Sequence, residues 1–314
     1  MKTVLITGIT GFIGRSLAPA LRAKGVNVVG VVRNPSEADL ASGVIRGDIL
    51  DKKFVNELIN KVEPDVVFHL AANRSRVGGL ADFRDCIEDN LIGTLNLAAA
   101  CVGKPFLEKF VEIGTCEEYG RSAGPFHEGM RESPVNGYSF SKTATTHLLQ
   151  TLHRAHYLPS VVLRPSLAYG PSQPTDMFLP ALILALFAGE PFAMSAGMQT
   201  RDYVFIDDLM EAVVLAATVA GCEGKVFNIC GGVPMLLKEV ALMVAKKIGG
   251  NAEKLLEFGK KTYRHGEIME YVASYKEAES ALGWRPRTTL DAGLGITVEH
   301  YRKLLNKTNR DKDV

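Results

Sequence analysis

The chain of 314 residues lacks several features that would place a protein in a class at once. Its 36 lysines and arginines are balanced by 35 acidic residues, so no excess charge favours nucleic acid or an anionic membrane as a partner. Its five cysteines are odd in number and show no CxxC spacing, which predicts free thiols in a reducing cytoplasm. The histidines show no metal-ligand spacing, and no apolar run is long enough to cross a membrane.

The start of the chain leaves no room for a signal peptide, because Met1, Lys2 and Thr3 run directly into an apolar segment. We therefore expect a cytoplasmic protein. The length fits one large domain or two closely associated ones.

The order of apolar segments predicts an α/β fold. Short apolar runs alternate with helical patterns through the first half, as in βαβ units of a parallel sheet. Strands are expected at 4–6, 26–32, 44–45, 66–70, 110–113 and 161–163, and helices at 54–61, 89–102, 138–156, 181–188 and 237–248. The runs at 203–206 and 225–229 are expected to return to the same sheet.

Three glycines follow the first expected strand at equal spacing, namely Gly8, Gly11 and Gly14. Gly8 would allow a sharp turn, Gly11 the close approach of a pyrophosphate, and Gly14 close packing of a helix on the strand. The N-terminus of that helix would offer free N–H groups to phosphate oxygens. The turn predicts a dinucleotide site, although such a turn also occurs without a ligand.

Tyr138 and Lys142 open a second feature with chemical potential. Residues four apart share one face of a helix, so the phenol and the ammonium should project into the same space. A nearby ammonium lowers the pKa of a phenol. Such a tyrosine can exchange a proton with a hydroxyl or carbonyl oxygen while hydride moves at the same carbon.

Together these segments resemble the extended short-chain dehydrogenase/reductase family, of the NAD-dependent epimerase/dehydratase type, which modifies nucleotide sugars. The first turn reads Thr-Gly-x-x-Gly-Phe-Ile-Gly, as in that family. Further matches are His69-Leu-Ala-Ala72, Gly47-Asp48-Ile49, the segment 90–96, the segment 163–171, the segment 201–208, Arg264-His-Gly-Glu267 and the segment 282–286. The resemblance implies a homodimer formed through the helices near 89–102 and 138–156.

The resemblance also implies a fold with two parts. One is a Rossmann-type doubly wound parallel sheet, formed by residues 1–165 with about 204–231. The other is a smaller, interleaved α/β substrate domain, formed by 166–203 with about 232–314, which closes over a cleft.

The resemblance implies contacts to a nicotinamide dinucleotide along the first half of the chain. These would come from Gly8, Gly11, Phe12, Ile13, Gly14, Asp48, Ile49, Leu70, Ala71, Ala72, Asn90, Tyr138, Lys142 and Pro165. No acidic residue ends the second strand, where NAD-selective folds place one, and Arg33 stands there instead. Arg33 would pair with a 2′-phosphate, which favours NADP over NAD, unless Arg33 merely begins a loop.

The segment 113–120 supplies the other catalytic candidates. By resemblance, the hydroxyl of Thr115 would hydrogen-bond the reacting sugar oxygen, although a threonine at a strand end often only satisfies the backbone. Glu117 stands where 4,6-dehydratases place a base, but Cys116 replaces their usual acid or serine, and a thiol is a poor general acid. We expect one of Glu117 and Glu118 to face the cleft and the other to face solvent.

Arg201 and Arg264 would grip the diphosphate of a nucleotide sugar, because guanidinium groups bind phosphate bidentately. The alternative for each arginine is a solvated surface charge. Leu167 stands where many family members carry an asparagine that contacts the substrate, which leaves the identity of the sugar open.

The amino-acid sequence of the segment 113–120 is most similar to that of 4-keto-6-deoxyhexose reductases. The first expectation is therefore reduction at C4 of such a sugar, carried by a nucleoside diphosphate. A 4-epimerase is the second and a 4,6-dehydratase using Glu117 the third. A family member that has lost catalysis and serves as an NADP-binding regulatory or scaffold protein is the alternative outside enzymes.

Overall fold

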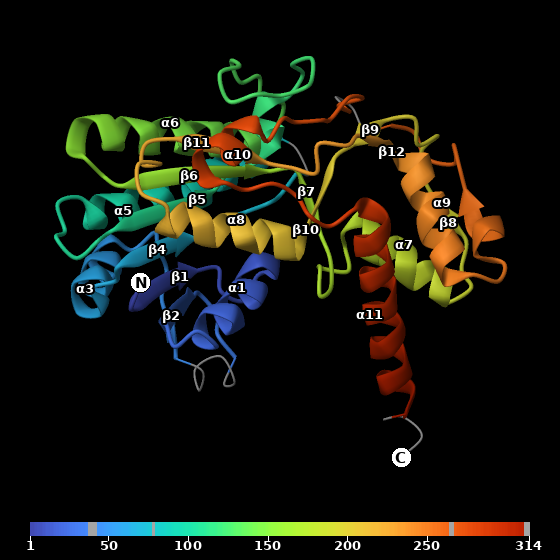
Figure 1. The fold of residues 1–314 in the computed structure, drawn as a ribbon, viewed down its shortest axis with the longest axis horizontal. Helices are drawn as coiled ribbons and strands as arrows, with labels where there is room; N and C mark the ends of the chain where they lie inside the picture. Colours follow the sequence, from blue (N-terminus) through green and yellow to red (C-terminus); the bar gives the residue numbers. More distant parts are fainter. Residues whose placement is uncertain (37–42, 77–78, 264–266, 311–314) are drawn as a thin grey trace.

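The computed structural model describes residues 1–36, 43–76, 79–263 and 267–310. Its centre is a parallel sheet of seven strands in the order β3-β2-β1-β4-β5-β6-β11 (Figure 1). These strands are β1 (Thr3–Thr7), β2 (Asn27–Val32), β3 (Val44–Arg46), β4 (Val66–His69), β5 (Lys109–Ile113), β6 (Ser160–Pro165) and β11 (Val226–Ile229). The order reverses between β1 and β4, and ligands of open α/β sheets bind at the carboxyl ends of strands at such a point. The predicted doubly wound α/β fold is confirmed.

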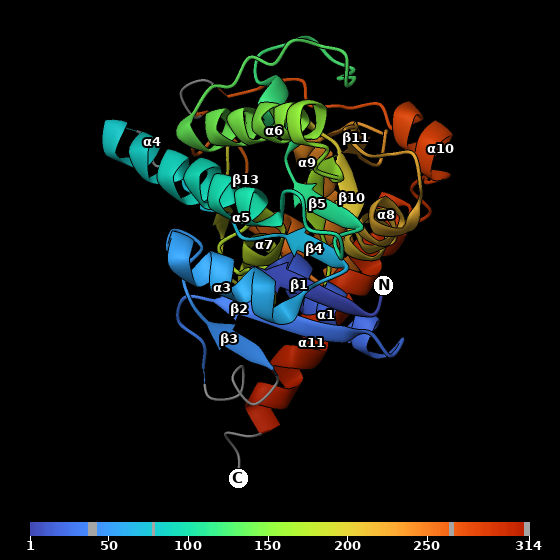
Figure 2. The same cartoon turned by 90° about the vertical axis from the view of Figure 1, so that its left-hand side faces the viewer.

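Helices cover both faces of this sheet (Figure 2). The alternation of side chains along each strand sends Leu5, Val67 and Phe110 into one core and Val4, Phe68 and Val111 into the other. The first core lies under α3 (Lys52–Val62), α5 (Gly93–Cys101) and α6 (Gly137–His156), and the second under α1 (Phe12–Arg22) and α8 (Ile206–Thr218). Burial on both faces explains why the strands are continuous apolar runs in the sequence.

The helix expected at 89–102 is part of a longer helical segment. It begins with α4 (Leu80–Cys86), continues as a π-helix over Ile87–Ile92 and ends as α5. The π-helical turn carries Asn90, whose side chain is buried. Such turns are rare and often lie at functional sites.

One expected strand lies outside the central sheet. β11 joins the sheet beside β6 as expected, but β10 (Tyr203–Phe205) pairs in parallel with β7 (Leu167–Tyr169) in a sheet of two strands. The expectation for 203–206 was therefore wrong. Because β11 already occupies the edge beside β6, β10 pairs instead with the strand into which the chain continues after β6.

The remaining elements lie beyond one end of the sheet, at the right of Figure 1. They include α7 (Phe178–Phe187), α9 (Leu237–Ile248) and α11 (Leu290–Arg310), with the strand pairs β9 (Thr200–Arg201) with β12 (Met235–Leu236) and β8 (Phe192–Ala193) with β13 (Leu256–Glu257). α10 (Lys276–Leu282) packs near β11. The apolar core of α7 and α9 is continuous with that of α1 and α8. The domain boundaries stay a prediction.

No helix within the described ranges is both long and apolar enough to cross a membrane.

Candidate active site

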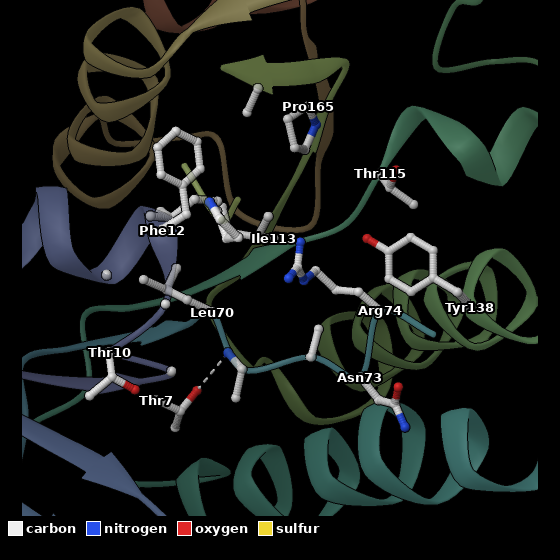
Figure 3. A pocket seen from close by; sticks show the side chains of 18 of the residues that line it. Thr7, Thr10, Phe12, Leu70, Asn73, Arg74, Ile113, Thr115, Tyr138 and Pro165 are labelled. Atoms are coloured by element: carbon white, nitrogen blue, oxygen red, sulfur yellow. Dashed lines mark hydrogen bonds between the residues drawn. The ribbon is translucent and has the colours of Figure 1, made fainter. Parts of the chain in front are cut away.

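A cavity of about 580 Å³ lies at the carboxyl ends of the central strands (Figure 3). Segments that follow β1, β2, β3, β4, β5 and β6 line it, as expected for a site at the reversal of strand order, together with residues of α6. The lining includes these predicted residues: Gly8, Gly11, Phe12, Ile13, Gly14, Arg33, Asp48, Ile49, Leu70, Ala71, Ala72, Thr115, Glu117, Tyr138, Lys142 and Pro165. Segments more than 150 residues apart in sequence thus share one cavity.

The glycine turn has the geometry of a phosphate cradle. Gly8 has a φ of +68°, and a Cβ there would lie 2.6 Å from the backbone nitrogen of Ala71. A Cβ on Gly14 would lie 2.5 Å from the carbonyl oxygen of Gly8, so the helix can pack this closely only without a side chain. A Cβ on Gly11 would meet only the Gly8 carbonyl oxygen, at 3.2 Å.

Helix α1 begins at Phe12 directly after this turn, and no side chain caps its N-terminus. Its first N–H groups are therefore available to a ligand, and the helix dipole favours a negative charge at that place. These features fit the pyrophosphate of a dinucleotide.

Tyr138 and Thr115 lie on the same side of the cavity (Figure 3). Burial raises the pKa of the Tyr138 phenol, and this outweighs the opposing effects of the Lys142 ammonium and a hydrogen bond with Thr115. Lys142 thus lowers the pKa of Tyr138 as expected, but the net direction is the opposite of the expected one. The reason is that Tyr138 is only 7% exposed, and burial disfavours the charged phenolate.

Lys142 points its ammonium toward the strand end below the cavity. Its Nζ donates hydrogen bonds to Oε1 of Glu112 at 2.8 Å and to the carbonyl oxygen of Ile113 at 2.7 Å. The side chains of Lys142 and Glu112 are almost completely buried. The sequence analysis did not anticipate Glu112.

Glu117 faces the cavity, where it forms an ion pair with Arg76. Nε of Arg76 donates to Oε2 of Glu117 at 3.0 Å, and the guanidinium lies 4.5 Å from the centre of the Tyr138 ring. Arg74, two residues earlier, also projects into the cavity (Figure 3). Both arginines were missed, although they lie in the segment that follows β4, at the edge where ligands bind, which could have indicated them.

Cys116 and Glu118 are turned away from the cavity. The Cys116 thiol donates to the carbonyl oxygen of Arg164, with a sulfur–oxygen distance of 3.1 Å, and burial raises its pKa. Glu118 is fully buried and pairs with Arg164 at 2.6 Å. The expectation that one of the two glutamates faces solvent was wrong, because a buried arginine compensates the charge of Glu118.

A sequence model of the NAD dependent epimerase/dehydratase family matches residues 4–230. The chain belongs to this family. The UDP-glucose 4-epimerase of Mycolicibacterium smegmatis is 31% identical over 96% of this chain and 99% of the relative. The dTDP-glucose 4,6-dehydratase of Neisseria gonorrhoeae is 30% identical over 98% of this chain and 97% of the relative. The resemblance to the extended short-chain dehydrogenases/reductases is confirmed.

Solved structures of family members have the same fold. The UDP-glucose 4-epimerase of Thermotoga maritima with UDP-glucose superposes with a TM-score of 0.88 at 27% identity, covering 96% of this chain and 99% of that one. The UDP-glucuronic acid 4-epimerase of Bacillus cereus, with UDP-glucuronic acid and NAD, has a TM-score of 0.85 at 30% identity, with coverages of 96% and 99%.

Two further residues predicted from the family's motifs do not line the cavity, namely Asn90 and Arg201. Asn90 does not line the cavity; it lies behind the cavity wall and joins two segments. Its Oδ1 accepts from the backbone nitrogen of Asn73 at 2.7 Å, and its Nδ2 donates to Oγ of Ser141 at 2.9 Å. Arg201 is also absent from the lining and forms an ion pair with Glu267. Arg264 lies outside the described residues.

Arg33 lies at the end of β2 and lines the cavity as expected, with its side chain 60% exposed. Its Nη1 is 3.1 Å from Oδ1 of Asp89. The guanidinium is therefore paired within the protein, by a contact that is open to solvent. Leu167 also lines the cavity, so an apolar side chain stands at the position that often carries an asparagine in the family.

Proposed function

We propose that this protein moves hydride between a nicotinamide cofactor and C4 of a hexose carried by a nucleoside diphosphate, with inversion at C4 as the net reaction. The observation that carries this proposal is that Thr115, Tyr138 and Lys142 line the same cavity as the glycine turn. The relatives named as 4-epimerases, which match over almost the whole chain, support inversion as the outcome.

The roles of the side chains follow from their chemistry. When bound, the nicotinamide would accept hydride from the sugar and return it. Tyr138 takes the proton of the 4-hydroxyl as a base and gives it back as an acid in the second half of the reaction. Thr115 donates a hydrogen bond to the same oxygen, and the positive charge of Lys142 stabilises the phenolate of Tyr138.

Dehydration across C5 and C6 is less well supported. It would need an acid beside Glu117, but the thiol of Cys116 is buried against Arg164, away from the cavity. Glu117 itself is held in an ion pair with Arg76. Both of its carboxylate oxygens accept from the Arg76 guanidinium, so Glu117 would have to leave this pair before it could take a proton from the sugar.

Reduction of a 4-keto-6-deoxy sugar by NADPH is the second candidate. Two features favour the reductase: the amino-acid sequence of the segment 113–120 and the position of Arg33 at the end of β2. Arg33 would have to leave Asp89 to meet a 2′-phosphate, and an exposed ion pair of this kind is worth only about 0–1 kcal/mol. A preference for NADP is therefore retained as part of this candidate.

The two candidates predict different needs for cofactor. The purified protein would be incubated with UDP- and dTDP-hexoses and with 4-keto-6-deoxy sugars, without added cofactor, with NADH and with NADPH. We expect interconversion of the C4 epimers without added cofactor, detected by chromatography. Consumption of NADPH with a keto sugar and no interconversion would favour the reductase. Cofactor binding with no turnover of any sugar would support a regulatory or scaffold protein.

We also infer that the protein is a homodimer formed through α4, α5 and α6. These helices lie together along one side of the molecule (Figure 2). Together with the π-helical turn between α4 and α5, they expose the large apolar side chains of Leu80, Ile92, Leu95 and Phe140, which a second copy would cover. The predicted cytoplasmic location agrees with five cysteines that are all free thiols.

We expect sedimentation velocity to show a dimer, and Leu95→Glu to convert it to a monomer, because a charge in the centre of an apolar interface is costly to bury. Ile296→Glu is the matched control, since Ile296 is an apolar residue on α11 that is 49% exposed, against 37% for Leu95. A dimer that survives Leu95→Glu, or a wild-type monomer, would contradict this assembly.

A further inference from the structure

A row of buried polar side chains crosses the sheet beneath the cavity. Thr7, His69 and Glu112 are neighbours in register on β1, β4 and β5. Oγ1 of Thr7 is 2.6 Å from Nδ1 of His69, and Nε2 of His69 is 2.9 Å from Oγ1 of Thr94 on α5. All of these side chains are at most 1% exposed. A row of this kind in the core of a sheet is unusual, because buried polar groups are costly unless each is satisfied.

Glu112 ends this row and is linked to Lys142. Its Oε1 accepts from Nζ of Lys142 at 2.8 Å, while its Oε2 has no hydrogen-bond partner among the described residues. Nε2 of His69 lies 3.8 Å from Oε2, too far for a hydrogen bond. The Glu112 carboxylate therefore pairs with the Lys142 ammonium through one oxygen and leaves its other oxygen without a hydrogen bond.

The other groups that face Lys142 leave Glu112 as its main counter-charge. Burial lowers the pKa of His69 to about 3, so the imidazole is neutral. Glu118 on the turn after β5 also acts on Lys142, but its carboxylate is already paired with Arg164. Tyr138, on the same helix, also acts on Lys142, but less than Glu112 does, and burial raises the pKa of the Tyr138 phenol.

We propose that Glu112 is a positioning residue that keeps the buried Lys142 side chain charged and holds it at the carbonyl of Ile113, beneath Tyr138. A buried amine without a counter-charge loses its proton, because a low-dielectric environment disfavours the ammonium. Here Glu112 contributes most against that effect, and together with Tyr138 and Glu118 it outweighs burial and raises the pKa of Lys142 above its usual value. Burial raises the pKa of Glu112 itself to about 7, against the opposing effect of the Lys142 ammonium. The consequence for catalysis rests on the proposed function, whereas the charge of Lys142 can be measured without any substrate.

Glu112→Gln tests this directly, because it removes the charge and keeps the shape. Protein labelled with carbon-13 at the lysine side chains would be titrated by NMR, with Lys142 assigned as the signal that Lys142→Arg removes. We expect Lys142 in Glu112→Gln to titrate roughly one pH unit or more below the wild type, the scale on which burial shifts a lysine. Lys142 titrating at the same pH in both proteins would overturn the proposal.

The matched control is Glu223→Gln. Glu223 pairs with Lys109, which is buried on the same strand three residues before Glu112. This substitution removes the partner of a buried lysine at the other end of β5, so Lys142 should titrate as in the wild type. An equal shift of Lys142 in this control would mean that any loosening of β5 has the effect, which would also overturn the proposal.

Two further measurements separate this role from a merely structural one. If the enzyme turns over, Glu112→Gln should lose activity at high pH and regain it as the pH is lowered and Lys142 is charged again. At about one pH unit above the lowered pKa, only roughly a tenth of Lys142 stays charged. If Glu112→Gln does not fold, Glu112→Gln with Lys142→Met should fold, because no unpaired charge remains. A double variant that is also unfolded would refute the pairing.

Discussion

Tyr138→Phe is expected to lower kcat for the proposed reaction by about 10²–10⁴, the usual contribution of a positioned acid–base group. The phenol is the group in the cavity that can take and return the proton of the sugar hydroxyl, and Thr115 orients that hydroxyl without replacing it. Cofactor affinity should be nearly unchanged, because phenylalanine keeps the ring against which the Arg76 guanidinium packs at 4.5 Å.

The measurement compares kcat by steady-state kinetics and cofactor affinity by fluorescence in the variant and the wild type. Tyr157→Phe is the control, since Tyr157 follows the last turn of the same helix and is 86% exposed. The control should keep the wild-type rate. A rate in Tyr138→Phe equal to that of the wild type would remove the proposed mechanism.

The central sheet and the glycine turn could be predicted because their causes are local. Each strand needs a run of apolar residues for burial on both faces, and this run is visible in the sequence around Leu5, Val67 and Val162. The turn needs glycine wherever a Cβ would collide, as at Gly8 and Gly14. The lining residues followed, because the carboxyl ends of parallel strands meet at one edge.

Charge pairing in the site could not be predicted, because its causes are distant in sequence. Glu112 and Lys142 are 30 residues apart, and a glutamate within β5 is compatible with the edge of a cavity as much as with a buried pair. Arg76 and Glu117 are 41 residues apart. The net direction of the Tyr138 pKa was wrong for the same reason, since the sequence shows the neighbouring lysine but not the degree of burial.

The buried position of Glu118 was also missed, because its partner is distant in the sequence. The expectation was that one of the two adjacent glutamates faces the cleft and the other solvent, but both have an arginine as partner, Arg76 for Glu117 and Arg164 for Glu118. Arg164, a charged residue at the end of the apolar run of β6, could have indicated a buried ion pair. An arginine there either faces the cavity or needs a buried acid, and Glu118 is that acid.

Arg164→Met is expected to lower the free energy of unfolding by about 3–5 kcal/mol, because it leaves the charge of Glu118 buried without a partner. Arg164 is 1% exposed, and its Nη2 lies 2.6 Å from Glu118 and 2.7 Å from Glu132. Its Nη1 also donates to the hydroxyl of Tyr119 at 3.0 Å. All of these contacts are lost together, while methionine fills part of the volume.

Urea denaturation followed by circular dichroism would measure this loss. Arg287→Met is the matched control, because Arg287 forms an ion pair of 2.8 Å with Glu211 but its side chain is 68% exposed. That change should cost less than about 1 kcal/mol, since solvent screens the exposed pair. Adding Glu118→Gln to Arg164→Met should recover part of the loss, because the unpaired charge is then removed. Equal stability of the two arginine variants would show that burial does not make the Glu118–Arg164 pair important for the fold.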